Sequence, residues 1–180
     1  LLLHRYDDEI VNKSAQSYTE ELIARHVSGR LKVAPEHTED NVLKMMRKPS
    51  FDQFGQFKKI FDRINKQQGL NQQLIPYFIS SHPGCTEEDM AKLAIETKKL
   101  HFQLEQVQDF TPTPMTLATE IYYTGYHPYT LEKVYTARTK EQKLAQRQFF
   151  FWYKPEFRRQ ITQALQKIGK KDLLTKLFGR

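Results

Sequence analysis

The stretch LIPYFISSHPGCTEEDMAKLAIETKKL, residues 74–100, predicts a strand, a sharp turn and a helix in succession. Leu74–Ile79 is a short apolar run rich in β-forming residues, as expected of a strand that is covered on both faces. Pro76 is an objection, because proline gives a sheet no N–H and suits an edge strand or a bulge. The sequence SHPG at residues 81–84 then ends the strand.

The end of this strand is a candidate ligand-binding site. Thr86 and Asp89 have nearly the spacing of a capping box, so a helix is expected to begin directly after the turn. In parallel α/β proteins, ligands bind where such strands end. Ser80, Ser81 and His82 therefore lie where a ligand would be.

Two further strands are predicted, at Leu31–Ala34 and Gln106–Phe110, and helical patterns alternate with the three strands. This alternation predicts an α/β fold with a parallel sheet and right-handed crossovers. Three strands are too few to close a barrel, so half of a larger barrel is the economical interpretation.

The first of these strands carries charges on an unexpected face. Lys32, Ala34 and Glu36 share one side of the strand because side chains alternate along it. Two interpretations stay open: a Lys32–Glu36 ion pair at an exposed strand end, or a polar barrel interior that faces a ligand.

The helices between the strands show apolar stripes. A first helix is expected to start at Ser17, which has Glu20 in capping-box spacing, and to end near Gly29. Another is expected to start at Ser50 and to present phenylalanines at helical spacing, which favours core packing over a surface for stacking bases. These phenylalanines are Phe51, Phe54, Phe57 and Phe61.

The composition changes after residue 114, so we predict a half-barrel over residues 1–114 and a Tyr-rich, basic helical extension over residues 115–180. The extension opens with a tyrosine-rich segment expected to be irregular and packed across the sheet. From Glu132 onward it holds 13 Lys or Arg and 4 Asp or Glu, within a chain of net charge +7. Either the extension binds a polyanion, with the aromatic run at residues 149–153 stacking on bases, or it is a set of well-solvated helices.

The totals restrict the class of protein. A length of 180 residues suggests one domain, no apolar run is long enough for a membrane span, and Cys85 is the only cysteine. One cysteine allows no internal disulfide and no complete thiolate metal site, which fits a cytoplasmic protein. The chain begins with Leu1 rather than Met, so we expect it to be a fragment.

Three segments together resemble the YgiQ family of radical S-adenosylmethionine proteins and, more distantly, the radical core of methylthiotransferases. These segments are LKVAPEHTEDNVLKMM (31–46), LIPYFISSHPGCTEEDM (74–90) and VQDFTPTPMTLATEIYYTG (107–125). The resemblance implies a (β/α)6 partial barrel. It also implies a [4Fe–4S] cluster held by a Cys-x3-Cys-x2-Cys motif. In that family the cluster cleaves S-adenosylmethionine to a 5′-deoxyadenosyl radical.

The chain departs from that family because the three-cysteine motif is absent. The resemblance therefore implies the last three barrel strands plus the extension. We expect no bound cofactor, no metal ligand and no catalysis from this part alone, and the catalytic residues and the substrate stay unknown.

The resemblance also implies cofactor contacts at the three strand ends. Glu36 would meet the ribose or methionine end of S-adenosylmethionine, with an ion-pair or capping role as the alternative. Ile79 would pack near adenine or simply belong to the core, and His82 would stack or form a surface turn. The remaining candidates are His37, Ser80, Ser81, Phe110, Thr111 and Pro112.

A half-barrel would leave apolar sheet uncovered. The expected partner is the missing N-terminal half, and the open sheet face predicts either a homodimer or occlusion by the tyrosine-rich segment. The competing hypotheses are a basic nucleic-acid-binding module and a purely structural interaction domain.

Overall fold

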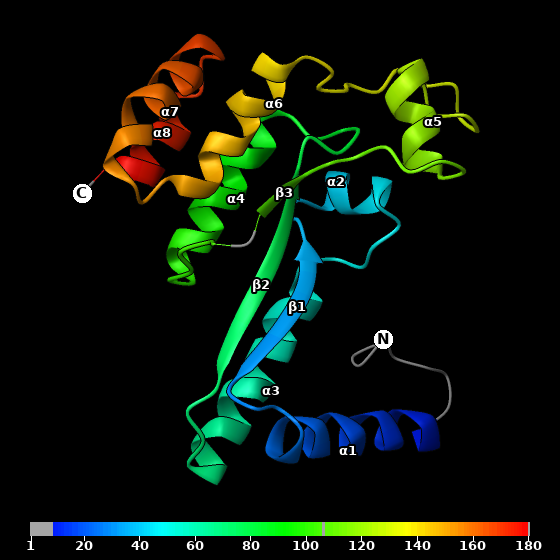
Figure 1. Cartoon of the computed structure of the whole chain (residues 1–180), viewed down its shortest axis with the longest axis vertical. Coiled ribbons are helices and arrows are strands. Elements are labelled where there is room, and N and C mark those ends of the chain that lie inside the picture. Colours follow the sequence, from blue (N-terminus) through cyan, green and yellow to red (C-terminus); the bar gives the residue numbers. More distant parts are fainter. Residues whose placement is uncertain (1–8, 106, 180) are drawn as a thin grey trace. The chain divides into compact units, whose positions relative to one another are not determined.

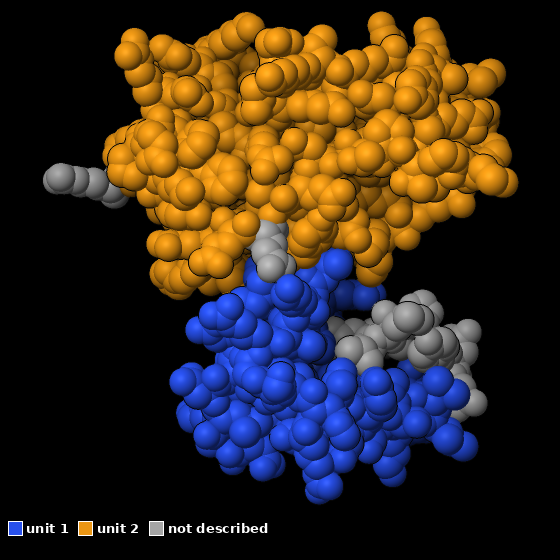
Figure 2. All heavy atoms as spheres, in the orientation of Figure 1, with its two compact units in different colours: residues 1–34, 51–76 blue, residues 35–50, 77–180 orange. Residues whose placement is uncertain are grey.

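The computed structural model describes residues 9–105 and 107–179, and its elements are drawn in Figure 1. The chain divides into two compact units, Leu1–Ala34 with Phe51–Pro76, and Pro35–Ser50 with Tyr77–Arg180 (Figure 2). The boundary predicted at residue 114 falls inside the second unit.

The three predicted strands form a parallel sheet in the order β1-β2-β3, which confirms the α/β class (Figure 1). The strands are β1 (Arg30–Glu36), β2 (Gln73–Ser80) and β3 (Val107–Asp109). The predicted third strand began at Gln106, which lies outside the described residues. In the register of β2 and β3, Ser80 is opposite Asp109.

The middle strand β2 tolerates Pro76 because β3 is short. Among the residues that the structure describes, β3 pairs with Phe78, Ile79 and Ser80, and Pro76 lies outside this pairing. Every second residue of β2 from Leu74 to Ser80 is buried, whereas Ile75, Tyr77 and Ile79, on the other face, are half-buried. The expectation that β2 is covered on both faces is therefore met on one face only.

The first unit is built on α1 (Glu9–Arg25) and α3 (Asp52–Gln68), which pack on each other. Phe54, Phe57 and Phe61 are buried, so the phenylalanine stripe is core, as predicted. The predicted start of α1 at Ser17 is wrong, because the helix begins eight residues earlier. Residues 9–16 contain no Gly or Pro, so nothing in them stops a helix.

α3 also begins later than predicted, at Asp52 with Phe51 in the N-cap position.

The polar residue Gln72 links the parts of this unit: its Nε2 donates to the carbonyls of Ile23 at 2.9 Å and Val27 at 3.1 Å.

The second unit is centred on α4 (Glu87–Lys99), which packs against α6 (Lys140–Arg147), the 3-10 helix η1 (Gln148–Phe151), α7 (Pro155–Lys167) and α8 (Lys171–Phe178). The unit also contains α2 (Asp40–Met45) and α5 (Leu117–Thr124). Thr86 and Asp89 form the predicted capping box at the start of α4.

The aromatic run at residues 149–153 is part of this core. Phe149 and Phe150 are 0% exposed. Trp152 Nε1 donates to Thr97 Oγ1 at 3.1 Å, and Tyr153 Oη donates to the Leu104 carbonyl at 3.0 Å. The hypothesis that this run stacks on bases is therefore wrong for its two buried phenylalanines, which a nucleic acid cannot reach.

The tyrosine-rich segment is more regular than predicted. α5 ends at Gly125, whose φ of 79° suits a left-handed cap, and Tyr126 forms an antiparallel bridge with Lys133. Tyr122 is buried, while Tyr123 and Tyr129 are exposed.

Candidate functional site: a cleft at the strand ends

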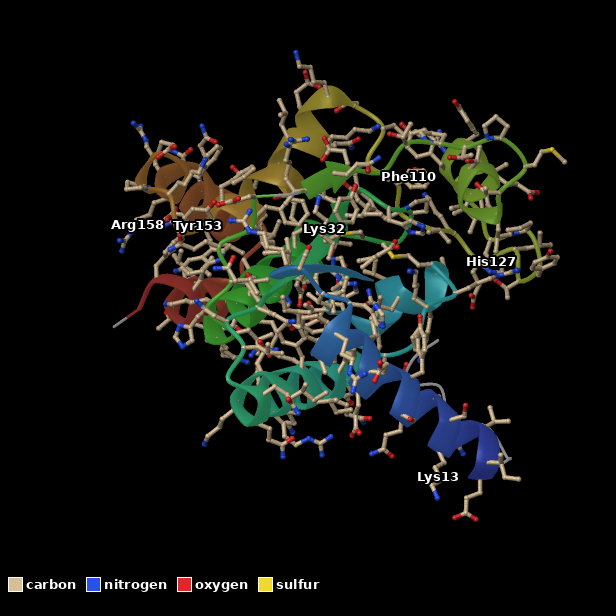
Figure 3. The ribbon with its side chains drawn as sticks, turned by 60° about the horizontal axis from the view of Figure 1, so that its bottom comes forward. Lys13, Lys32, Phe110, His127, Tyr153 and Arg158 are labelled. Carbon is tan, nitrogen blue, oxygen red and sulfur yellow. The ribbon has the colours of Figure 1, made fainter. Side chains whose placement is uncertain are left out.

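A cleft of about 460 Å³ lies where the strands end, and its lining comes entirely from the second unit. A volume of this size is typical of small-molecule sites. Five of the predicted residues line it: Glu36, Ile79, His82, Phe110 and Thr111. Figure 3 labels Phe110, which directly follows β3. The carboxyl ends of the strands thus contribute to one cavity, as the parallel-sheet argument predicts.

The backbone is strained at the cleft. Glu36 ends β1 with a φ of 67°, Ser81 follows β2 with a φ of 62°, and Arg47 after α2 has a φ of 55°. Left-handed φ values are uncommon for residues other than glycine and cost free energy. Such outliers persist only where the surrounding packing holds the backbone in place, and they cluster at ligand sites.

Charges of both signs line the cleft. Glu36 Oε1 lies 2.8 Å from Lys48 Nζ, so its carboxylate pairs with the lysine after α2 and not with Lys32. Arg47 is exposed and has no carboxylate within ion-pair distance among the residues that the structure describes. A carboxylate that accepts hydrogen bonds and a guanidinium that donates them together suit the ammonium and carboxylate of an amino-acid group.

An aromatic corner forms one wall of the cleft. The rings of His82 and Phe110 meet edge-on with centroids 5.0 Å apart, and Phe110 also contacts the ring of Tyr122 at 5.7 Å. Burial lowers the pKa of His82, so its ring is neutral near pH 7. Its Nδ1 lies 2.9 Å from the Pro83 carbonyl and therefore carries the hydrogen, which leaves Nε2 as an acceptor.

His37 lies behind the cleft and does not line it. Its side chain is fully buried, Nδ1 accepts the N–H of Glu39 at 3.1 Å, and Nε2 lies 3.5 Å from Cys85 Sγ. Burial lowers the pKa of His37 to about 3. Burial also raises the pKa of the Cys85 thiol. Both groups are uncharged and join the two strand-end turns from behind.

Three further predicted residues do not line the cleft. Ser80 is fully buried and its Oγ donates to Asp109 Oδ1 at 2.5 Å. Ser81 is also fully buried, and its Oγ has no hydrogen-bond partner among the described residues. Pro112 is half-buried beside the lining residue Thr111. The two serines therefore support the strand-end turn and do not face the cleft.

Several residues that line the cleft were not predicted from the sequence. Asp109 could have been found, because it is the last residue of a strand that ends beside Ser80. Apart from Gln108 of β3, the others come from the end of α2, from loops and from α5, where no sequence periodicity marks a ligand site. They include Met45, Met46, Arg47, Thr113, Leu117 and Ala118.

The described residues do not fit an iron–sulfur cluster. Over residues 9–105 and 107–179, no three His, Cys, Asp or Glu side chains lie close enough together to hold a metal ion. The thiol of Cys85 is buried against His37.

Comparison with known proteins places the chain in a family. It is 68% identical over 180 residues to a UPF0313 protein of Bacteroides thetaiotaomicron. The matched region is 100% of this chain and 29% of that protein. A UPF0313 protein of Porphyromonas gingivalis is also 68% identical over the whole chain, which spans 28% of its length. The UPF0313 protein YgiQ of Escherichia coli is 43% identical over 162 residues, 87% of this chain and 22% of that protein.

The fold and the strand-end cleft therefore define an α/β protein with a candidate small-molecule site. The chain belongs to the UPF0313 family, which includes YgiQ, and it spans less than a third of the length of these relatives. A domain of unknown function, DUF3362, matches residues 105–177. No helix in the described part of the chain has the length and apolar character that a membrane crossing needs.

Proposed function

We propose that this chain is part of a radical S-adenosylmethionine enzyme and supplies the strand-end half of its cofactor site. The observation that carries the proposal is the cleft itself, because strand-end residues, an aromatic corner and charges of both signs line a single cavity. S-adenosylmethionine has a group to match each of these features: an adenine ring, ribose hydroxyls and an amino-acid end.

The residues of the cleft would divide this work. Phe110 and His82 would hold the adenine against an apolar wall that includes Ile79. The carboxylate of Glu36 would accept hydrogen bonds from ribose hydroxyls or from the ammonium group. When bound beside a [4Fe–4S] cluster, this cofactor supplies a 5′-deoxyadenosyl radical that abstracts hydrogen from a substrate.

The cluster itself is assigned to the rest of the protein. The described residues offer it no ligand set. This chain would therefore bind and orient S-adenosylmethionine.

The test is a calorimetric titration of S-adenosylmethionine into the full-length protein, followed by reduction and detection of 5′-deoxyadenosine. We expect saturable binding, and we expect the chain on its own to bind much more weakly. Full-length protein that binds neither S-adenosylmethionine nor S-adenosylhomocysteine would refute the proposal. Equally tight binding by the isolated chain would refute the claim that the other half is needed.

A cleft-filling variant makes the titration specific to this site. Ala118→Trp places a large ring in the cleft from α5 without removing any polar group, so it should abolish binding. Glu120→Trp is the matched control, because Glu120 lies on the same helix, is exposed and does not line the cleft. Equal affinity in the two variants would locate the cofactor elsewhere.

A further inference from the structure

The turn after β2 leaves backbone groups that the sheet cannot satisfy. Ser81 has a left-handed φ of 62° and Gly84 a φ of 86°, so the chain folds back on itself, and Cys85 N donates to the His82 carbonyl at 2.9 Å. The N–H of Ser81 and the carbonyl of Cys85 stay available on the inner side of the turn. An unpaired buried backbone group is costly, so another element must bond to them.

Gln146 of α6 satisfies both groups at once. Its Oε1 accepts the N–H of Ser81 at 2.8 Å, and its Nε2 donates to the Cys85 carbonyl at 2.6 Å. The Gln146 side chain is 0% exposed, so these hydrogen bonds do not compete with water. A third hydrogen bond comes from the loop before α6. The N–H of Gly84 donates to the Tyr135 carbonyl at 2.8 Å, which holds the tip of the turn.

The next residue, Arg147, reaches the end of β3. Its Nη1 lies 3.1 Å from Asp109 Oδ2, and Asp109 Oδ1 accepts the hydrogen bond of Ser80 Oγ at 2.5 Å. Adjacent helical residues point about 100° apart. Gln146 and Arg147 can therefore hold two different strand ends from the same turn of α6.

α6 is itself fixed at its start. Thr139 and Gln142 form a capping box, in which Gln142 Oε1 accepts the Thr139 N–H at 3.0 Å and also the Arg138 N–H at 2.9 Å. The helix packs on α4 and η1. α6 is thus fixed at its start by the cap and along its length by its packing, and Gln146 and Arg147 lie in its last turn.

We infer that α6, which lies within the segment matched by DUF3362, acts as a brace that sets the geometry of the strand-end cleft, with Gln146 and Arg147 as positioning residues. Gln146 fixes the turn that carries His82, and Arg147 fixes Asp109, which lines the cleft next to Phe110. The consequence for S-adenosylmethionine rests on the function proposed above, whereas the consequence for the backbone does not.

The test compares Gln146→Met with Gln148→Met in the full-length protein. Gln148 is a matched control, since it is also buried but, within the described part of the chain, its side chain donates to the Ala145 carbonyl three residues earlier and not to a strand-end turn. Hydrogen exchange, measured by mass spectrometry on peptides covering residues 78–86, should become roughly tenfold faster or more in Gln146→Met. It should stay within about twofold of wild type in Gln148→Met. Unchanged exchange in Gln146→Met would overturn the brace.

Arg147 provides a second route if Gln146→Met does not fold. Arg147 is partly exposed, so Arg147→Met should fold, with faster exchange over residues 107–112, and Arg147→Lys should restore part of the protection. No change over those residues in Arg147→Met would also overturn the inference.

Binding of S-adenosylmethionine is the separate arm of the experiment. We expect the dissociation constant to rise about tenfold in Gln146→Met and to stay unchanged in Gln148→Met. If wild-type protein binds no cofactor while the exchange results hold, the proposed function fails and the brace stands. If wild-type protein binds cofactor and the exchange of Gln146→Met is unchanged, the brace fails and the function stands.

Discussion

His37 Nε2 lies 3.5 Å from Cys85 Sγ, and neither side chain is exposed to solvent. Because Nδ1 of His37 accepts the N–H of Glu39, the hydrogen of the neutral ring is on Nε2 and faces the sulfur. The contact connects residues 48 positions apart and joins the turn after β1 to the turn after β2. Two uncharged side chains therefore hold the loops of the cleft together.

The buried imidazole makes stability depend on pH. The pKa of His37 is about 3 in the fold against an ordinary value of 6.5. The unfolded chain therefore binds a proton below pH 6.5 that the fold does not, and the contribution of His37 is complete above pH 6.5 and lost as pH falls toward 3. We expect the free energy of unfolding to drop by about 1.4 kcal/mol per pH unit in this window.

Urea unfolding at pH 7.5 and pH 5 measures this effect. His37→Gln should flatten the difference by roughly 2 kcal/mol, whereas His101→Gln, at an exposed position, should keep the wild-type difference. An equal difference in wild type and His37→Gln would show that another group is responsible.

The thiol of Cys85 should be inert in the fold. It is 0% exposed and burial raises its pKa, so little thiolate forms and reagents cannot reach it. We expect iodoacetamide at pH 8 to modify Cys85 only as fast as the protein opens, and to react fully in 6 M guanidinium chloride. Rapid modification of folded protein would contradict the buried position.

Glu36 should contribute to cofactor affinity. Glu36→Ala should weaken binding of S-adenosylmethionine by the full-length protein by roughly 1–3 kcal/mol, the range for removing a charged hydrogen-bond partner. Glu39→Ala is the control, because this carboxylate lies three residues on and pairs with Lys92 instead of lining the cleft. An unchanged dissociation constant in Glu36→Ala would exclude Glu36 from the site.

Two glycines separate backbone strain from steric contact. Gly69 has a φ of 64°, and a Cβ there would meet no atom within 4 Å, so Gly69→Ala should cost about 1 kcal/mol from backbone strain alone. Gly84 has a φ of 86°, and a Cβ there would lie 3.2 Å from Met45 Cγ. Gly84→Ala should therefore cost about 2 kcal/mol or more in thermal or urea unfolding. Equal costs would mean that Met45 moves aside freely.

The basic extension gives a test of the nucleic-acid hypothesis. Arg158, Arg159 and Lys171 are exposed, but the buried Phe149 and Phe150 cannot stack on bases. We expect only weak, electrostatic binding of a single-stranded oligonucleotide at 50 mM salt, lost at 200 mM. Submicromolar binding at the higher salt in a filter assay would restore that hypothesis.

The sequence predicted β2 well because an apolar run there has a clear end. Leu74–Ile79 followed by SHPG placed β2 to within one residue at each end. The start of α1 was missed because Ser17 has a cap-like neighbour in Glu20 but no helix breaker before it. A cap pattern alone does not distinguish a helix start from a helix interior.

The cleft was predictable where strand ends supply it and unpredictable where loops and α5 do. Residues such as Phe110 follow from strand order, because parallel strands gather their carboxyl ends. Gln146 is remote in sequence and has no motif, since its role depends on how α6 packs. His37 was expected beside a ligand, and only its burial shows that it packs behind the site.

The left-handed backbone at Glu36 has a consequence for engineering. Glycine adopts a φ of 67° without steric cost, so Glu36→Gly would relieve about 1 kcal/mol of strain and remove a carboxylate from the cleft. Selection for thermal stability alone would then favour a protein with a weaker site. A library screened at this position only by melting temperature would be expected to enrich variants that have lost affinity for the proposed ligand.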